Sequence, residues 1–302
     1  MTPQIAHDAL DMIEYREAPS ILIFTDSEAA TTRAAASAKR AGYRVQGVAG
    51  IANGLERLGE QIALDAVLVE VDGDQGAVMD RLLDRLNQAA REARHATIVS
   101  VPAHMIDAVA ARTADPSVYQ LVDATDADRE EALRLAAQPS RPFLHDVGKG
   151  NAPIRLQQLS EEVSRIAGIL ANLSEEEKDG AAETGAAGVT AQQVRGMIRA
   201  RRLRDQYFGA DLFADPAWDM LLDLMAARLE RQRVAVSSLC IAAAVPATTA
   251  LRWIKTLTEH GLFVRSADPE DGRRVYIELS EGAAAALSAY LRAAQRQSPF
   301  LS

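Results

Sequence analysis

The chain has 302 residues, of which 48% are hydrophobic and 25% charged, values typical of soluble globular proteins with about two domains. Its apolar runs are as short as strands, so we expect no membrane span, and the N-terminus lacks the pattern of a signal peptide. The single cysteine, Cys240, excludes an intramolecular disulfide, and the histidines are too scattered for a helical metal pair. We therefore expect a cytoplasmic protein without metal or cofactor.

The net charge of −9 is unevenly distributed along the chain. From Arg195 to Ser302 there are 15 Lys and Arg against 12 Asp and Glu, whereas the preceding residues have 18 against 30. An acidic front and a mildly basic back indicate two parts with different partners. A basic excess of this size is weak evidence for nucleic-acid binding by itself.

After an N-terminal extension, residues 1–19, short apolar runs alternate with helical segments over residues 20–138. Strands are predicted at 21–24, 44–48, 66–71, 96–101 and 118–122, and helices at 27–41, 50–58, 76–93, 103–113 and 126–137. Continuous apolar strands separated by helices indicate a parallel sheet covered on both faces. The pattern predicts a doubly wound α/β domain of flavodoxin-like strand order.

Polar side chains stand at the ends of three predicted strands: Asp26 in "FTDS", Glu70 in "DAVLVEVDGD" and Ser100 in "IVSV". Their spacing resembles that of response-regulator receiver domains. The resemblance implies that Asp26 is what remains of the family's acidic pair, Glu70 replaces the phosphate-accepting aspartate, and Ser100 is the hydroxyl residue. The family's lysine is missing near Asp123.

Phosphotransfer of this kind requires an Asp nucleophile, metal-holding acids and the lysine. We therefore expect a receiver-like domain that is not phosphorylated. The alternative is an unrelated α/β domain of the same type, with Asp26 as a solvent-facing loop acid.

Residues 139–153 are rich in Pro and Gly and predict a linker. Residues 154–175 follow with a short heptad pattern made by Leu156, Leu159, Val163, Ile166, Leu170 and Leu173. The pattern favours a helix that pairs two chains, and the alternative is an amphipathic helix that docks on its own chain. Residues 176–189 are typical of a flexible tether.

Residues 190–302 contain further helices. The first, about Thr190 to Phe208, includes the basic run "RARRLRD", which faces either DNA phosphates or solvent. In the second, Asp215 is the expected N-cap and Pro216 the first helical residue. Its predicted buried stripe consists of Trp218, Leu221, Leu222, Met225 and Leu229.

Two short helices follow. Ser237 or Ser238 is expected to cap "SLCIAAAV", which Pro246 stops, and "PATTALRWIKTLTEH" ends before Gly261, a residue suited to a left-handed cap. Two short helices joined by a tight turn predict a helix-turn-helix. The core face of the second helix is formed by Ala250, Trp253, Ile254 and Leu257.

The outward residues of this second helix are Ala247, Thr248, Leu251, Arg252 and Lys255. An exposed Leu251 between Thr248 and Arg252 suits contact with a thymine methyl group. Arg252 would reach a guanine edge or a phosphate. These residues predict a recognition helix for the major groove of DNA.

A β-hairpin is predicted directly after the recognition helix. Its strands are "LFVRS" and "RRVYIELS", its turn is "ADPEDG", and Val275, Ile277 and Leu279 alternate inward. In this position the hairpin is a wing, with Arg273 and Arg274 beside the minor groove. Asp271 is expected to orient Arg273 through a charge-assisted hydrogen bond. The alternative is a solvated turn with balanced charges.

From about Trp218 to Leu291 the chain resembles the MarR family of winged-helix transcription regulators. The resemblance lies in "SSLCIAAAVPATTALRWIKTLTEHGLFVR" followed by "DPEDGRRVYIELSEGAAAAL". It implies a winged helix-turn-helix that binds DNA as a dimer, with Asp271-Gly272-Arg273 as the family's Asp-x-Arg wing motif. The preceding α/β domain departs from the family, so ligand sensing is not carried over. Cys240 is expected to be a core residue rather than an oxidant sensor.

Together these patterns predict a bacterial-type transcription regulator that binds double-stranded DNA as a homodimer. The N-terminal domain would serve dimerisation or contact with a signal or protein partner. The alternative is a protein-interaction adaptor whose winged helix contacts protein. Neither an enzyme nor a membrane protein is expected, because the sequence has no paired carboxylates, nucleophile–base pair or cofactor loop.

Overall fold

The computed structural model describes residues 18–60, 64–137, 188–208 and 213–297. The predicted linker, heptad helix and tether lie outside the described residues, together with most of the N-terminal extension. The predicted dimerisation residues fall in this part of the chain: Leu156, Leu159, Val163, Ile166, Leu170 and Leu173. Their pairing stays a prediction.

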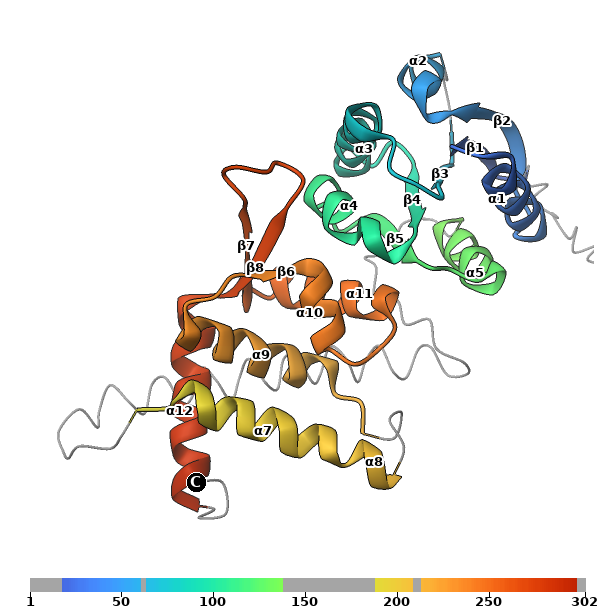
Figure 1. Ribbon diagram of the computed structural model, residues 1–302. Helices are drawn as coiled ribbons and strands as arrows, with labels where there is room; N and C mark the ends of the chain where they lie inside the picture. Colours follow the sequence, from blue (N-terminus) through green and yellow to red (C-terminus); the bar gives the residue numbers. More distant parts are fainter. Residues whose placement is uncertain (1–17, 61–63, 138–187, 209–212, 298–302) are drawn as a thin grey trace, which may run out of the picture.

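The N-terminal domain is built on five parallel strands in the order β2-β1-β3-β4-β5 (Figure 1). The strands are β1 (Ser20–Thr25), β2 (Arg44–Gly50), β3 (Ala66–Glu70), β4 (Ala96–Val101) and β5 (Val118–Val122). This is the predicted flavodoxin-like order. β1 and β3 are buried along their whole length, because their apolar side chains alternate between two covered faces.

Helices cover both faces of this sheet. On one face lie α1 (Glu28–Arg40) and α5 (Asp126–Ala136), and on the other lie α2 (Gly54–Gly59), α3 (Gly76–Arg91) and α4 (Ile106–Arg112). Short 3-10 turns, η1 (Ile51–Asn53) and η2 (Ala103–Met105), precede α2 and α4 where single helices were predicted. The hydroxyl groups of Ser27 and Thr125 cap α1 and α5.

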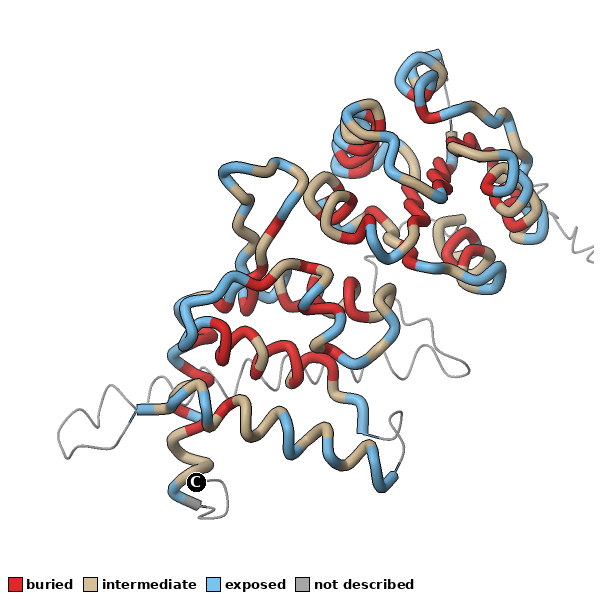
Figure 2. Tube along the Cα trace, viewed as in Figure 1, coloured by how far each residue is buried: buried red, intermediate tan, exposed pale blue. Residues whose placement is uncertain are grey.

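The C-terminal domain combines helices with a small antiparallel sheet of order β6-β8-β7. Its elements are α7 (Ala191–Leu203), α8 (Asp205–Phe208), α9 (Pro216–Glu230), β6 (Val234–Ala235), α10 (Val236–Ala242), α11 (Ala247–Glu259), β7 (Phe263–Ala267), β8 (Val275–Leu279) and α12 (Glu281–Gln297). α9 is central to this domain and is buried along most of its length (Figure 2). Within the described residues no single helix has the length and apolarity to cross a membrane, and only the bent pair of α10 and α11 meets both criteria together.

The start of α9 confirms one prediction and its end corrects another. Asp215 caps the helix by accepting a hydrogen bond from the backbone N–H of Trp218, at 3.2 Å. Leu229 was placed in the buried stripe, but it is 38% exposed. It lies in the last turn, beyond Ala227, where the helix leaves the core.

The helix-turn-helix has the expected shape. α10 and α11 are bent by 108° relative to each other, and Gly261 takes the predicted left-handed conformation after α11, with φ of 70°. The predicted serine cap of α10 is wrong, because Ala235 is the N-cap and its side chain makes no capping bond. The carboxylate of Asp107, in α4 of the other domain, accepts the backbone N–H of Ser237 at 2.9 Å and its hydroxyl at 2.6 Å.

Candidate nucleic-acid interface

The predicted recognition helix, α11, has two covered faces. Ala250, Ile254 and Leu257 pack into the C-terminal core, as expected. On the opposite side α11 lies against β5 of the N-terminal domain (Figure 1). The predicted exposure of Leu251 is wrong, since only 8% of this residue is accessible.

A hydrogen bond between a side chain of α11 and the backbone of β5 joins the helix directly to the sheet edge. The hydroxyl oxygen of Thr248 accepts the N–H of Val122 at 2.9 Å. Val122 ends β5, the edge strand of the parallel sheet, where one side of the strand has no neighbouring strand. Thr248, which was predicted to contact DNA bases, therefore binds the edge strand of the N-terminal sheet.

The basic side chains of α11 line a cavity of about 280 Å³ between the domains. Arg252 and Lys255 face it from α11, with Arg265 from β7 and Asp115 and Tyr119 from the N-terminal domain. Burial lowers the pKa of Lys255 to about 8, and it also lowers the pKa of Arg265. The Arg265 guanidinium donates a hydrogen bond to the backbone carbonyl of Ala110. These cations are therefore partly removed from solvent.

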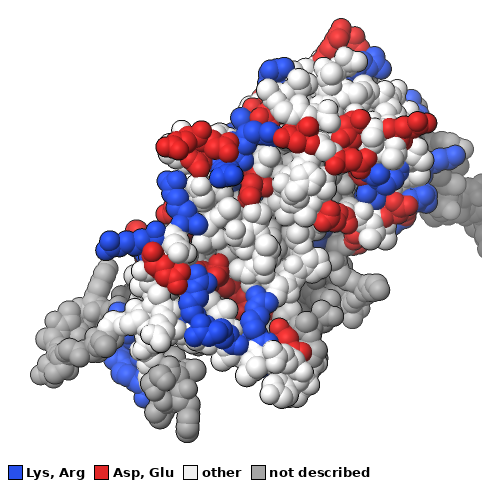
Figure 3. Space-filling view, in the orientation of Figure 1, with Lys and Arg blue, Asp and Glu red and all other residues white. Residues whose placement is uncertain are grey.

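The wing formed by β7 and β8 also contacts the N-terminal domain. Both terminal nitrogens of Arg273 donate to the Asp74 carboxylate at 2.7 Å, and its Nε lies 3.2 Å from Asp80 Oδ1. The hydrogen bonds from Arg273 hold the pKa of Asp74 well below its ordinary value, at about 2. Basic and acidic side chains lie next to one another around the tip of the wing (Figure 3).

The predicted role of Asp271 needs correction. Its carboxylate accepts the backbone N–H of Arg273 at 2.9 Å, and it lies 3.4 Å from Nε of Arg274. The guanidinium of Arg273 is instead held by Asp74 and Asp80. The sequence reading did not identify Asp74 and Asp80 as partners of Arg273, because they are distant in sequence and no local motif connects them to the wing.

Two arginines of the basic run in α7, and Arg195 earlier in the helix, serve packing within the C-terminal domain. Arg201 Nε donates to Asp219 in α9 at 2.8 Å, and Arg202 donates to the carbonyl of Ala242 at the end of α10. Arg195 bonds to both Asp223 and Glu230. These arginines tie α7 to its neighbouring helices, a use that was neither of the two considered from the sequence.

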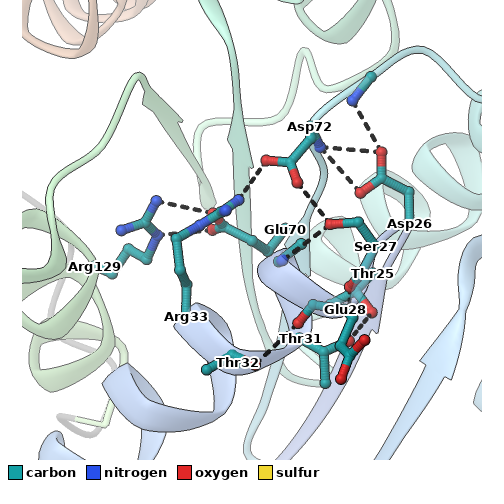
Figure 4. Close-up of polar contacts among 12 residues, drawn as sticks. Thr25, Asp26, Ser27, Glu28, Thr31, Thr32, Arg33, Glu70, Asp72 and Arg129 are labelled. Carbon is teal, nitrogen blue, oxygen red and sulfur yellow. Dashed lines mark hydrogen bonds and ion pairs between the residues drawn. The ribbon is translucent and has the colours of Figure 1, made fainter.

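Glu70, at the C-terminal end of β3, lies in the predicted receiver pocket and is bound by two arginines (Figure 4). It is 2% exposed, and Arg129 from α5 donates to its two oxygens, each at 2.8 Å. Arg33 from α1 adds a contact at 3.1 Å. Ser100 is the register partner of Glu70 on β4 and is also buried. The sequence reading missed both arginines, because neither lies in a strand-end motif.

Asp26, after β1, holds the loop that follows β3 (Figure 4). Its carboxylate accepts the backbone N–H groups of Asp72 at 3.0 Å and Gly73 at 2.9 Å. The Asp72 carboxylate in turn bonds to Ser27 and Arg33, which lower its pKa. Asp123, near which the resemblance to receiver domains would place a lysine, accepts the N–H of Ala103 at 3.1 Å. The carboxylates that would act in phosphotransfer are thus engaged with internal partners.

Cys240 lies in the C-terminal core and is 4% exposed. Burial raises the pKa of its thiol to about 12, so the reactive thiolate is disfavoured at neutral pH. The prediction of a core cysteine is confirmed.

Comparison with known families agrees with this geometry. A family described as "Winged helix DNA-binding domain" matches residues 222–283, which span α10, α11 and the wing. The C-terminal domain is a winged helix. Winged-helix domains contact DNA through their second helix and wing, and in this chain the corresponding elements, α11 and the β7–β8 hairpin, contact the N-terminal domain.

Solved structures provide a weaker comparison for the winged helix. A probable transcriptional regulator from Pseudomonas aeruginosa is 26% identical, covering 35% of this chain and 75% of its own, with a TM-score of 0.24. A mutant of MarR from E. coli is 19% identical. The match covers 40% of this chain and 85% of that protein, with a TM-score of 0.25. MepR from S. aureus, in a DNA-binding conformation, is 20% identical. The match covers 38% of this chain and 86% of that protein, with a TM-score of 0.24. No curated protein matches the chain.

Proposed function

We propose that this protein is a sequence-specific transcription regulator that binds double-stranded DNA as a homodimer. The observation that carries the proposal is the succession of a helix-turn-helix and a wing with Arg273 and Arg274 near its tip. In such domains the second helix enters the major groove. Thr248, Arg252 and Lys255 would then meet base edges and phosphates, and the wing arginines would lie beside the minor groove.

Exposed apolar side chains support the homodimer part of the proposal. At the end of α7 and in α8, Leu203 is 50% exposed, Tyr207 74% and Phe208 63%. Large apolar side chains gathered on a surface are typical of protein–protein contacts. Two copies joined through this region or through the heptad segment would present two recognition helices to a two-fold-related site.

The N-terminal domain is proposed to act without phosphorylation, as a contact module for a signal or protein. Glu70 is longer than an aspartate by one methylene and is enclosed by Arg33 and Arg129. A buried carboxylate with these partners is a poor acceptor for a phosphoryl group. We propose no catalytic activity for the chain.

The test of DNA binding uses fragmented genomic DNA retained by the full chain at several salt concentrations, followed by sequencing. A regulator retains fragments that share a two-fold motif, and its affinity falls steeply as salt rises. Arg252→Ala should change the sequence preference, at a cost of about 1–3 kcal/mol for the best site. Arg273→Ala should weaken binding, whereas Arg134→Ala, on an exposed face of α5, should not. Unchanged binding in both Arg252→Ala and Arg273→Ala would remove the groove and wing assignments.

One observation favours a second candidate, a protein-interaction adaptor. In the structure the recognition helix and the wing contact protein, through Val122, Asp74 and Asp80. An adaptor of this kind would show no salt-dependent affinity for DNA. Absence of retention at low salt by every variant would support it.

A further inference from the structure

We infer that the N-terminal domain is an intramolecular competitor of DNA. The face made by β5, α4, α3 and the loop before α3 docks on the recognition helix and wing, and DNA binds only after the two faces separate. The inference rests on the proposed function, because it takes α11 and the wing as the DNA-binding surface.

The contact on the recognition helix is apolar and continuous with the C-terminal core. Ile106, Ala110 and Val122 of the N-terminal domain belong to the same buried cluster as Leu251 and Ile254 of α11. Ala110 is 1% exposed and Ile106 6%. Burial of such side chains stabilises the closed arrangement, and it covers the side of α11 that a major groove would have to receive.

The contact on the wing is electrostatic. Arg273 offers a fork of donors of the kind that binds phosphate or carboxylate, and Asp74 takes two of these donors at 2.7 Å each. Asp80, only 13% exposed in its side chain, lies 3.2 Å from the third nitrogen. These carboxylates occupy the guanidinium as DNA phosphates or bases would, so Arg273 cannot bind both partners at once.

A third contact holds α10, the first helix of the helix-turn-helix. Asp107 of α4 accepts both the backbone N–H and the hydroxyl of Ser237. It thereby satisfies a free N–H group in the first turn of α10, which lacks a side-chain cap of its own. Both helices of the motif and the wing are therefore engaged by one domain.

The apparent dissociation constant for DNA rises as the open fraction falls, because only the open form binds. Weakening the interface from the N-terminal side should therefore tighten DNA binding without altering any residue proposed to touch DNA. Asp74→Asn/Asp80→Asn is the variant of choice. Asparagine removes the charge, and at position 74 it keeps an oxygen that can accept the N–H of Gly76.

We expect Asp74→Asn/Asp80→Asn in the full chain to bind a duplex enriched in the retention experiment about tenfold more tightly than wild type. The reason is that the variant weakens two partly exposed ion pairs that hold the closed form. The measurement is fluorescence anisotropy at fixed salt. The matched control is Glu28→Gln/Glu56→Gln, which removes the same charge from exposed positions in α1 and α2. It should change affinity by no more than about twofold, the share due to overall charge.

A second pair of variants tests the contact on α10 from both sides. Asp107→Ala removes both hydrogen bonds, whereas Ser237→Ala removes only that of the hydroxyl group. We expect both to tighten DNA binding, with the larger effect in Asp107→Ala. Small-angle X-ray scattering without DNA should show a larger radius of gyration in the same order, which separates domain opening from damage to the fold.

The outcomes distinguish the two proposals. Tighter binding and greater expansion in the interface variants, with an unchanged control, support competition. DNA binding by wild type that the interface variants leave unchanged overturns the competition and leaves the proposed regulator standing. No binding by any variant at low salt overturns the regulator and the competition with it.

Discussion

Replacing Arg129 by methionine should destabilise the N-terminal domain, because it leaves the Glu70 carboxylate buried without its main partner. Glu70 is 2% exposed and the Arg129 side chain 7%, and two hydrogen bonds of 2.8 Å join them. Breaking a buried ion pair from one side costs about 3–5 kcal/mol. Arg33 keeps its contact at 3.1 Å and is 34% exposed. We therefore place the loss near the lower limit, at about 3 kcal/mol.

Urea unfolding can assign this loss to the correct domain. Both tryptophans, Trp218 and Trp253, lie in the winged helix, so their fluorescence follows that domain, whereas far-ultraviolet circular dichroism follows both. With a slope of about 1.5 kcal/mol per molar urea, a loss of about 3 kcal/mol moves the N-terminal midpoint down by about 2 M. The fluorescence transition should move less.

Two further variants decide whether the reasoning is right. Arg134→Met, on the same helix, removes a surface pair with Glu130 and should leave the midpoint unchanged. Glu70→Met/Arg129→Met should recover much of the stability, since no unpaired charge remains. A midpoint for Arg129→Met equal to that for Arg134→Met would refute the argument that the buried carboxylate needs its arginine.

Further predictions follow from the other sites. Incubation with acetyl phosphate should leave the intact mass unchanged, and a phosphate on Asp72 or Asp74 would contradict the unphosphorylated domain. Cys240 should resist thiol reagents at pH 8 until urea is added, because its pKa is raised to about 12; rapid labelling of the native chain would exclude a buried position. Burial lowers the pKa of Lys255 from 10.5 to about 8, so the closed form binds fewer protons and should become more populated as the pH rises from about 8 to 10.5. Fluorescence energy transfer between the domains should report this change. The pH dependence should vanish in Lys255→Met, and a pH dependence that survives in that variant would be due to another titrating group.

Local patterns were sufficient for most of the fold. The individual strands and helices, the caps at Asp215 and Gly261 and the inward residues of the wing are consequences of periodicity and turn chemistry within short segments. The alternation of strands and helices then predicted the flavodoxin-like strand order. The predictions that failed concern contacts between segments. Leu229 was misplaced by extending a helical stripe past the core, and α10 was given a serine cap although Asp107 supplies the acceptor.

The sequence by itself determined that a helix-turn-helix and an arginine-bearing wing follow an α/β domain, because helical spacing and turn residues are encoded within tens of residues. It also indicated that Glu70 stands where the receiver family has an aspartate. Only the tertiary structure decided which groups these residues meet. Arg129 reaches Glu70 across 59 positions and Arg273 reaches Asp74 across 199, and Leu251 is buried by a second domain rather than exposed to solvent. Charge and hydrophobicity make a side chain suited to a partner, but packing of distant segments selects which partner it has.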